Sequence, residues 1–172
     1  MINEVAAAAY SCADGGVIAS CVGTVPAGAR IATGAAGSMT FTVDARDAAG
    51  HSASATASYT VGFTVRPAFD QTASIQRGKT VGIAIQLIDA AGLNVSSASI
   101  PVVVTGLRAV SNGAAVPLRD SEWLNPDHAF RFGYGAYGYA LSTKGLTAGT
   151  YELQFTTGAD PLVHAVQFRV GR

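Results

Sequence analysis

The sequence predicts an all-β protein built from two β-sandwiches in tandem. Apolar residues alternate with small or polar residues along several segments, and turn sequences such as Asp-Ala-Ala-Gly separate these segments. Helical periodicity does not persist over about ten residues anywhere in the chain. In addition, one pattern of a bend followed by a strand occurs twice, which divides the chain into two units of the same class.

The second copy of this pattern covers residues 146–155, which read L-T-A-G-T-Y-E-L-Q-F. Tyr151 follows a bend that contains Gly149, and the residues after it alternate between apolar and polar. In immunoglobulin-type (Ig-like) sandwiches, a tyrosine after such a bend turns its ring into the core while its hydroxyl binds backbone a few residues upstream. We therefore predict a structural corner at Tyr151 and Gly149.

The first copy covers residues 36–43, A-G-S-M-T-F-T-V, with apolar residues in the same phase. Each copy is followed by a turn-rich loop and a closing strand. The predicted fold class is therefore two tandem Ig-like (Greek-key) β-sandwich domains.

Individual strands follow from the alternation of apolar residues. In the first half we expect strands over residues 5–13, 17–25, 39–45 and 53–61. In the second half we expect them over residues 80–88, 100–104, 107–110, 130–134, 137–141, 151–155 and 164–170.

The boundary between the two halves lies in residues 59–65, Y-T-V-G-F-T-V, which read as one uninterrupted strand stopped by Arg66 and Pro67. Gly62 is the weak point of this strand. We place the domains at residues 1–62 and 63–172, and expect a stiff end-to-end arrangement because the linker is so short.

Composition excludes several classes of partner. Eleven basic and eleven acidic side chains, with no run of like charge, provide no field that would attract nucleic acid or an anionic membrane. No run reaches the roughly 18 apolar residues of a membrane span, and the alanine tract at residues 6–9 lacks the flanks of a signal peptide. A neutral surface of Ser, Thr, Gly and Ala favours an extracellular protein.

The two cysteines, Cys12 and Cys21, flank a turn-like sequence at residues 14–17 and fall opposite each other in the hairpin that we expect there. A disulfide that closes so short a loop would stabilise the domain by about 3 kcal/mol. A pair of buried free thiols is the alternative. A metal site is disfavoured because no histidine or third cysteine lies nearby.

Motifs in the first half resemble a known family. Residues 10–14, Y-S-C-A-D, are followed by Cys21 and then by T-F-T-V-D-A-R-D-A-A-G at residues 40–50. These motifs resemble the bacterial Ig-like repeats of secreted and surface proteins, over about residues 5–61. Such repeats begin with an additional strand where this chain has only residues 1–5, so the resemblance implies a first sandwich without its opening edge strand.

The second half resembles the bacterial PxKF domain, which often follows those repeats at the C-terminus of a surface protein. The similarity lies in residues 78–92 and in residues 139–151, followed by the strand that begins at His164. Gly82 and Ala84 stand where the family has its naming Pro and Lys. The resemblance implies a non-catalytic extracellular module and supplies no catalytic residue.

Residues that could support chemistry are scattered. We expect structural or exposed roles for His51, His128 and His164. A calcium site between the domains would draw on Asp44 and Asp47 with Asp14 or Asp89, but the chain has no D-x-D-x-D-G loop and turn formation explains Asp47 and Asp89. We therefore predict no metal, no cofactor and no enzymatic activity.

Aromatic residues offer a second kind of candidate site. Trp123 and Tyr137 are candidates for stacking against a sugar ring, although core packing would equally explain the aromatic residues around them. Glu122 and Asp127 flank Trp123, but nothing in their spacing marks a catalytic carboxylate pair.

These observations predict a structural or adhesive module of a bacterial surface protein, whose partners are other protein domains or copies of itself. An unpaired edge in the first sandwich would accept a strand from a neighbour and give a homo-oligomer or filament, with the Ala-rich segment before Tyr10 or the tail after Val170 as donor. Deletion of residues 1–5, or separately of residues 168–172, should then abolish the assembly. The alternative from another class is an accessory carbohydrate-binding module of a secreted hydrolase. Loss of glycan binding on Trp123→Ala or Tyr137→Ala would favour that alternative.

Overall fold

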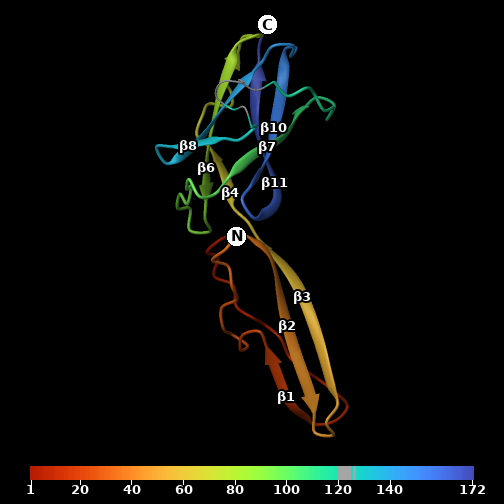
Figure 1. The fold of residues 1–172 in the computed structure, drawn as a ribbon. Coiled ribbons are helices and arrows are strands. Elements are labelled where there is room, and N and C mark those ends of the chain that lie inside the picture. Colours follow the sequence, from red (N-terminus) through yellow and green to blue (C-terminus); the bar gives the residue numbers. More distant parts are fainter. Residues whose placement is uncertain (120–124, 126) are drawn as a thin grey trace.

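The computed structural model describes residues 1–119, 125 and 127–172. The regular secondary structure in these ranges consists of β-strands, so the prediction of an all-β fold is confirmed. One three-stranded sheet and a pair of four-stranded sheets lie end to end, which gives an elongated molecule (Figure 1). In the described residues, no helix is long and apolar enough to cross a membrane.

The first half contains one antiparallel sheet in the order β1-β2-β3. Its strands are β1 (Ile18–Gly23), β2 (Gly37–Asp47) and β3 (Ser52–Val61). A tight turn joins β2 to β3, and Gly50 within it has a φ of 98°, which favours glycine. β2 and β3 then pair without a register shift, from the pair of Arg46 with Ser52 to the pair of Gly37 with Val61.

The strand predicted over residues 5–13 is not present. This segment has one isolated bridge, from Ala7 to Arg30, and its other backbone bonds also go to residues 28–31. The amide of Ala8 donates to the carbonyl of Ala29 at 2.8 Å, for example. Its alanines bury little apolar surface, so a loop partner suffices. Extended segments therefore form the second layer of the first half in place of a second sheet.

The second half is a sandwich of two four-stranded sheets. One sheet has the order β4-β6-β9-β8, from β4 (Thr64–Pro67), β6 (Thr80–Ile88), β9 (Ala136–Ser142) and β8 (Arg131–Gly133). The other has the order β5-β11-β10-β7, from β5 (Ser74–Ile75), β11 (Asp160–Val170), β10 (Gly149–Thr157) and β7 (Val102–Ala109). The two strands predicted at 100–104 and 107–110 are one strand, β7, with a register shift opposite Gln154 and Phe155.

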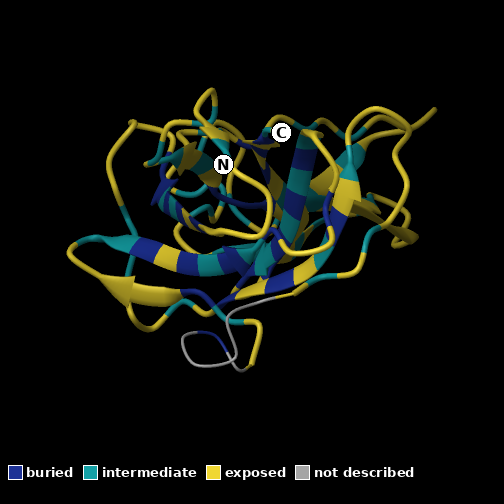
Figure 2. Ribbon diagram, turned by 90° about the horizontal axis from the view of Figure 1, so that it is seen from above, coloured by how far each residue is buried: buried dark blue, intermediate teal, exposed yellow. Residues whose placement is uncertain are grey.

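The hydrophobic core lies between these two sheets. Along β6, Val81, Ile83, Ile85 and Leu87 are at most 3% exposed, as the predicted alternation requires. The same banding of buried and more exposed positions runs along other strands of the sandwich (Figure 2). In the first half, by contrast, β2 and β3 have one buried side chain between them, that of Val61.

The chain does not cross between the halves as one strand. β3 ends at Val61 and β4 begins at Thr64, so the uninterrupted strand predicted over residues 59–65 is wrong. The amide of Phe63 donates to the Oδ2 atom of Asp160 at 2.8 Å instead of to a strand. A Cβ atom on Gly62 would lie 2.6 Å from the same oxygen, so only glycine fits beside this carboxylate.

Candidate interaction surface

The most unusual surface of the molecule is the outer edge of β3. The described chain provides a strand partner on one side of β3, namely β2, and none on the other. Residues 52–58 are all exposed, including the alanines at 53, 55 and 57. Backbone N–H and C=O groups along such an edge are free to pair with another strand.

The apolar face of this sheet is only partly covered. Ala53, Ala55 and Ala57 lie opposite Ala45, Val43 and Phe41 of β2 and so share one face with them. A groove of about 370 Å³ lies over this face between residues 10–13 and the alanines of β3. The sheet therefore presents an apolar floor next to an open edge.

Tyr10 and the disulfide hold the covering segment in place. The Tyr10 ring lies 5.8 Å from the Phe41 ring, its hydroxyl donates to the carbonyl of Val25, and the amide of Gly23 donates to that hydroxyl at 2.9 Å. Cys12 and Cys21 form a disulfide with a Cα–Cα distance of 5.8 Å.

The expected hairpin around this disulfide is absent, because β1 pairs with β2 and residues 5–13 bind residues 28–31. The cysteines therefore join a loop to a sheet edge.

A buried carboxylate holds the start of the second half, next to the boundary between the halves. The side chain of Asp160 is fully buried at the start of β11 and accepts hydrogen bonds from the amides of Phe63 and Leu162. It also lies 2.9 Å from the Nε2 atom of His164. These bonds anchor the linker to the sandwich.

The N-terminal segment lies at the same junction. The amide of Ile2 donates to the carbonyl of Gly62, and the amide of Ala90 donates to the carbonyl of Ile2. The side-chain amide of Asn3 donates to Asp89 at 3.1 Å. This bond, followed by the backbone amide of Leu93, holds the pKa of Asp89 below its usual value.

Both predicted donor segments are bonded within the chain. The Ala-rich segment before Tyr10 bonds to residues 28–31, and the amide of Gly171 donates to the carbonyl of Ile75. The residues next to these segments are also held in place. Residues 1–5 bond to residues from each half, and Ile2 packs against the core of the sandwich. At the other end, Val170 is 4% exposed and pairs with Gly149 and Ile75. Neither segment can reach a neighbour without leaving these contacts.

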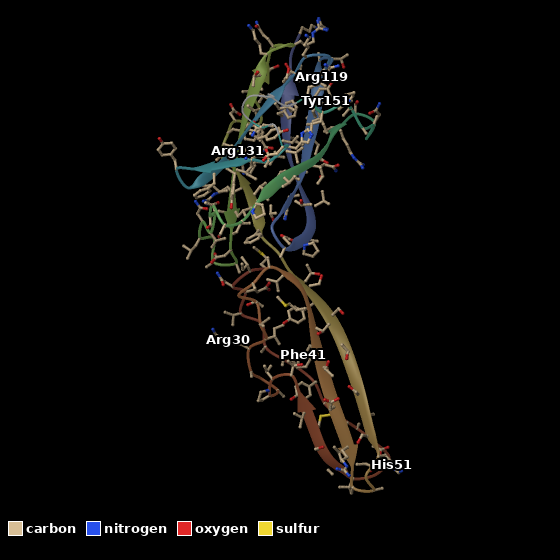
Figure 3. The ribbon with its side chains drawn as sticks, viewed as in Figure 1. Arg30, Phe41, His51, Arg119, Arg131 and Tyr151 are labelled. Carbon is tan, nitrogen blue, oxygen red and sulfur yellow. A yellow bond between two sulfur atoms is a disulfide. The ribbon has the colours of Figure 1, made fainter. Side chains whose placement is uncertain are left out.

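Tyr151 and Gly149 lie at the start of β10. The Tyr151 ring is 4% exposed and stacks on Phe168 at 5.8 Å. Its hydroxyl donates to the carbonyl of Thr147 at 3.0 Å and accepts from the amide of the same residue. Figure 3 shows this side chain inside the sandwich. The bonds close the bend before β10.

Of the two predicted stacking residues, the structure describes Tyr137. Tyr137 is 1% exposed, and its hydroxyl donates to the carbonyl of Ser97 at 2.8 Å, so its assignment to a sugar-binding surface is wrong. Burial raises the pKa of this hydroxyl. Trp123 and Glu122 lie outside the described residues. Tyr134, at the tip of the β8–β9 hairpin, is fully exposed instead.

The histidines lie apart from one another. His51 is exposed at the far tip of the β2–β3 hairpin (Figure 3), where its Nδ1 lies 2.7 Å from Asp47 and the hydrogen bond lowers the pKa of that carboxyl. His164 lies at the junction, and the carbonyl of His128 accepts a hydrogen bond from the amide of Val104. Asp127 pairs with Arg131 at 2.9 Å.

The two turn aspartates of the candidate calcium site are already hydrogen-bonded. Asp47 and Asp89 each serve a local turn and a neighbouring side chain. Within residues 1–119, 125 and 127–172, no group of three or more His, Cys, Asp or Glu side chains could hold an ion.

Comparison with known proteins gives distant structural similarity. No protein-family model matches the chain, and no curated protein matches it. Among solved structures, the filamin domain of Lin-41 has 16% identity and a TM-score of 0.38, covering 63% of this chain and 92% of that chain. Domains 4–9 of the surface-layer protein SbsC have 13% identity and a TM-score of 0.33, covering 77% of this chain and 18% of that chain.

A chimeric titin Z1Z2 tandem has 18% identity and a TM-score of 0.31, covering 77% of this chain and 63% of that chain. Similarity at this level does not bear on function, which has to be argued from the surfaces of the chain itself.

Proposed function

We propose that this chain is a non-catalytic structural or adhesive module of a bacterial surface protein, which self-assembles through the open sheet of its first half. In this proposal the chain divides after residue 62 into a bacterial Ig-like domain and a PxKF-like sandwich. Its partners are other protein domains or further copies of itself, in a filament or smaller oligomer.

The observation that carries the proposal is the open sheet. The sheet has three strands, and β2 and β3 together contain one buried side chain. Apolar surface is therefore left exposed, and the backbone groups on the outer edge of β3 are left without a strand partner. An isolated sheet of this size is poorly stabilised in water, and association with another strand would bury what is left open. Association through this sheet would therefore stabilise the first half.

The junction supports a structural role. Ile2 bonds to Gly62 of the first half and to Ala90 of the second, and Asp160 holds Phe63 just after the boundary, which favours a stiff joint. A module with a stiff joint transmits force and keeps a set distance better than one with a flexible tether. The disulfide between Cys12 and Cys21 supports an oxidising, extracellular compartment.

Electron microscopy of the purified protein tests the assembly. We expect particles larger than one chain, in which the first half lies in the contact. Uniform single chains at all concentrations would contradict the self-assembly. Hydrolysis of a glycan or peptide that is abolished by one substitution would contradict the non-catalytic role.

The carbohydrate-binding alternative retains one observation in its favour, the fully exposed ring of Tyr134 at the β8–β9 tip. Exposed aromatic rings can stack on sugars, although one ring is a small platform. Glycan-array binding that is lost on Tyr134→Ala, with Tyr59→Ala as the control, would favour this function.

A further inference from the structure

We infer that β3 binds β3 of a second copy of this chain, antiparallel and edge to edge around a two-fold axis. The inference rests on the proposed self-assembly and specifies which strand forms the contact. It differs from strand exchange, because every segment stays where it is in the single chain and β3 gains a partner on its free side.

Several other sheet edges of the described chain carry features that hinder pairing. β1 has a register shift between Ile18 and Ser20, and β4 is four residues long and contains Arg66 and Pro67. β5 and β8 have two and three residues. β7 is bridged on its outer side to Ala115 and Ala129. Bulges, prolines, charges and short length are the usual ways in which proteins prevent edge pairing.

β3 has none of these protections. It is ten residues long, S-A-S-A-T-A-S-Y-T-V, without a charged residue or a proline. It pairs with β2 without a register shift, so no bulge turns the edge away. The outer edge of β3 is therefore suited to accept a strand.

The sequence of β3 is complementary to itself. A two-fold axis at Thr56 would place Ala55 of one copy opposite Ala57 of the other. Ala53 of one copy would likewise lie opposite Tyr59 of the other. Residues 52–60 of both copies would then be paired, and every pair joins residues from the same face because alternate residues share a face. Alanines meet apolar residues on one face, and serines and threonines meet each other on the opposite face.

The two ends of the chain are not free to occupy this edge. Residues 1–5 are bonded at the junction, and Val170 is buried in the sandwich. The second β3, in contrast, is exposed and extended before the copies meet. Such a pre-ordered strand loses little conformational entropy on pairing. The contact is also isologous, so β3 pairing alone gives a closed dimer.

The test is a charge swap at Thr56, which would face its own copy across the axis. Thr56 is exposed, and its side chain contacts Thr42. We expect Thr56→Lys and Thr56→Glu each to weaken self-association more than about tenfold, because like charges then lie opposite each other. An equimolar mixture of the two variants should regain association. Sedimentation velocity over a dilution series measures all three.

Thr40→Lys is the matched control. Thr40 is also exposed and on the same polar face, but it lies on the central strand β2. The Thr40→Lys variant should self-associate as the unmodified protein does. Unchanged circular dichroism of all variants shows that they fold.

If the unmodified protein associates and both Thr56→Lys and Thr56→Glu associate equally well, the β3 contact is overturned. Self-assembly would then use another surface. If the unmodified protein stays a 17.4 kDa monomer at every concentration, both the β3 contact and the self-assembly are overturned. Variants that lose association but do not recover it in the mixture overturn the two-fold pairing at Thr56.

Discussion

Replacing Asp160 by alanine should loosen the attachment of Phe63, just after the boundary between the halves, to the sandwich. Asp160 accepts hydrogen bonds from the amides of Phe63 and Leu162, and its carboxylate contacts His164. Leu162 is half exposed, so water can replace the carboxylate at its amide. Phe63 is 7% exposed, and its amide would be left without an acceptor.

The size of the effect follows from these environments. A buried donor without a partner costs about 1–3 kcal/mol, and loss of the charged acceptor for His164 adds about 1 kcal/mol. The relief of burying a charge offsets part of this sum. We therefore expect opening at Phe63 to become easier by about 1–3 kcal/mol, which corresponds to about 5- to 150-fold.

Native-state hydrogen exchange at the Phe63 amide measures this opening directly. Asp160→Asn keeps the shape and one acceptor, so its effect should be about half as large in free energy. Asp70→Ala is the matched control, because Asp70 also accepts three hydrogen bonds but lies in an exposed turn. Exchange at Phe63 that is equally slow in Asp160→Ala would refute this account of the junction.

Three further predictions concern stability. Gly23→Ala should destabilise the first half by about 1–3 kcal/mol in denaturant unfolding, because its Cβ would lie 2.6 Å from the Tyr10 ring; an unchanged midpoint would contradict this packing. Tyr151→Phe should cost about 1 kcal/mol through loss of its buried hydroxyl bonds, and a neutral result would show that the corner does not contribute to stability. Asp89 has a lowered pKa, so its contribution is full above the unfolded value of about 3.9 and is lost as the pH falls through the folded value. Asn3→Ala should therefore lower the melting temperature at pH 7 more than at about pH 3, and a loss that is equal at both would argue against this bond.

The sequence predicts the sandwich well because its signals are local. Strands such as β6 bury every second residue, and this alternation is visible without any knowledge of the fold. The position of Tyr151 after its bend is equally local, since its hydroxyl reaches only as far as Thr147.

The failures depend on distant residues. The break at Gly62 depends on Asp160, which is 97 residues from Phe63 in the sequence. Tyr137 and Tyr134 look alike in the sequence, but one lies between the sheets and the other at a hairpin tip. The spacing of Cys12 and Cys21 suits a hairpin as well as the loop-to-sheet link that is present, because a disulfide requires only that the two Cα atoms approach.

The open edge was expected from a missing first strand, but the strand that is exposed could not be identified in advance. β3 is an edge because the first half has a single sheet, and the Ala-rich sequence of residues 5–13 does not reveal that it stays outside that sheet. Only the pairing partners of each segment decide this point.

The central claim is that the molecule is a structural module which associates through its first half. Sedimentation velocity of the unmodified protein across a dilution series tests it most directly. We expect a mass that rises above 17.4 kDa with concentration, together with slower hydrogen exchange at the amides of β3. A constant mass of one chain, with β3 amides that exchange freely at every concentration, would contradict it.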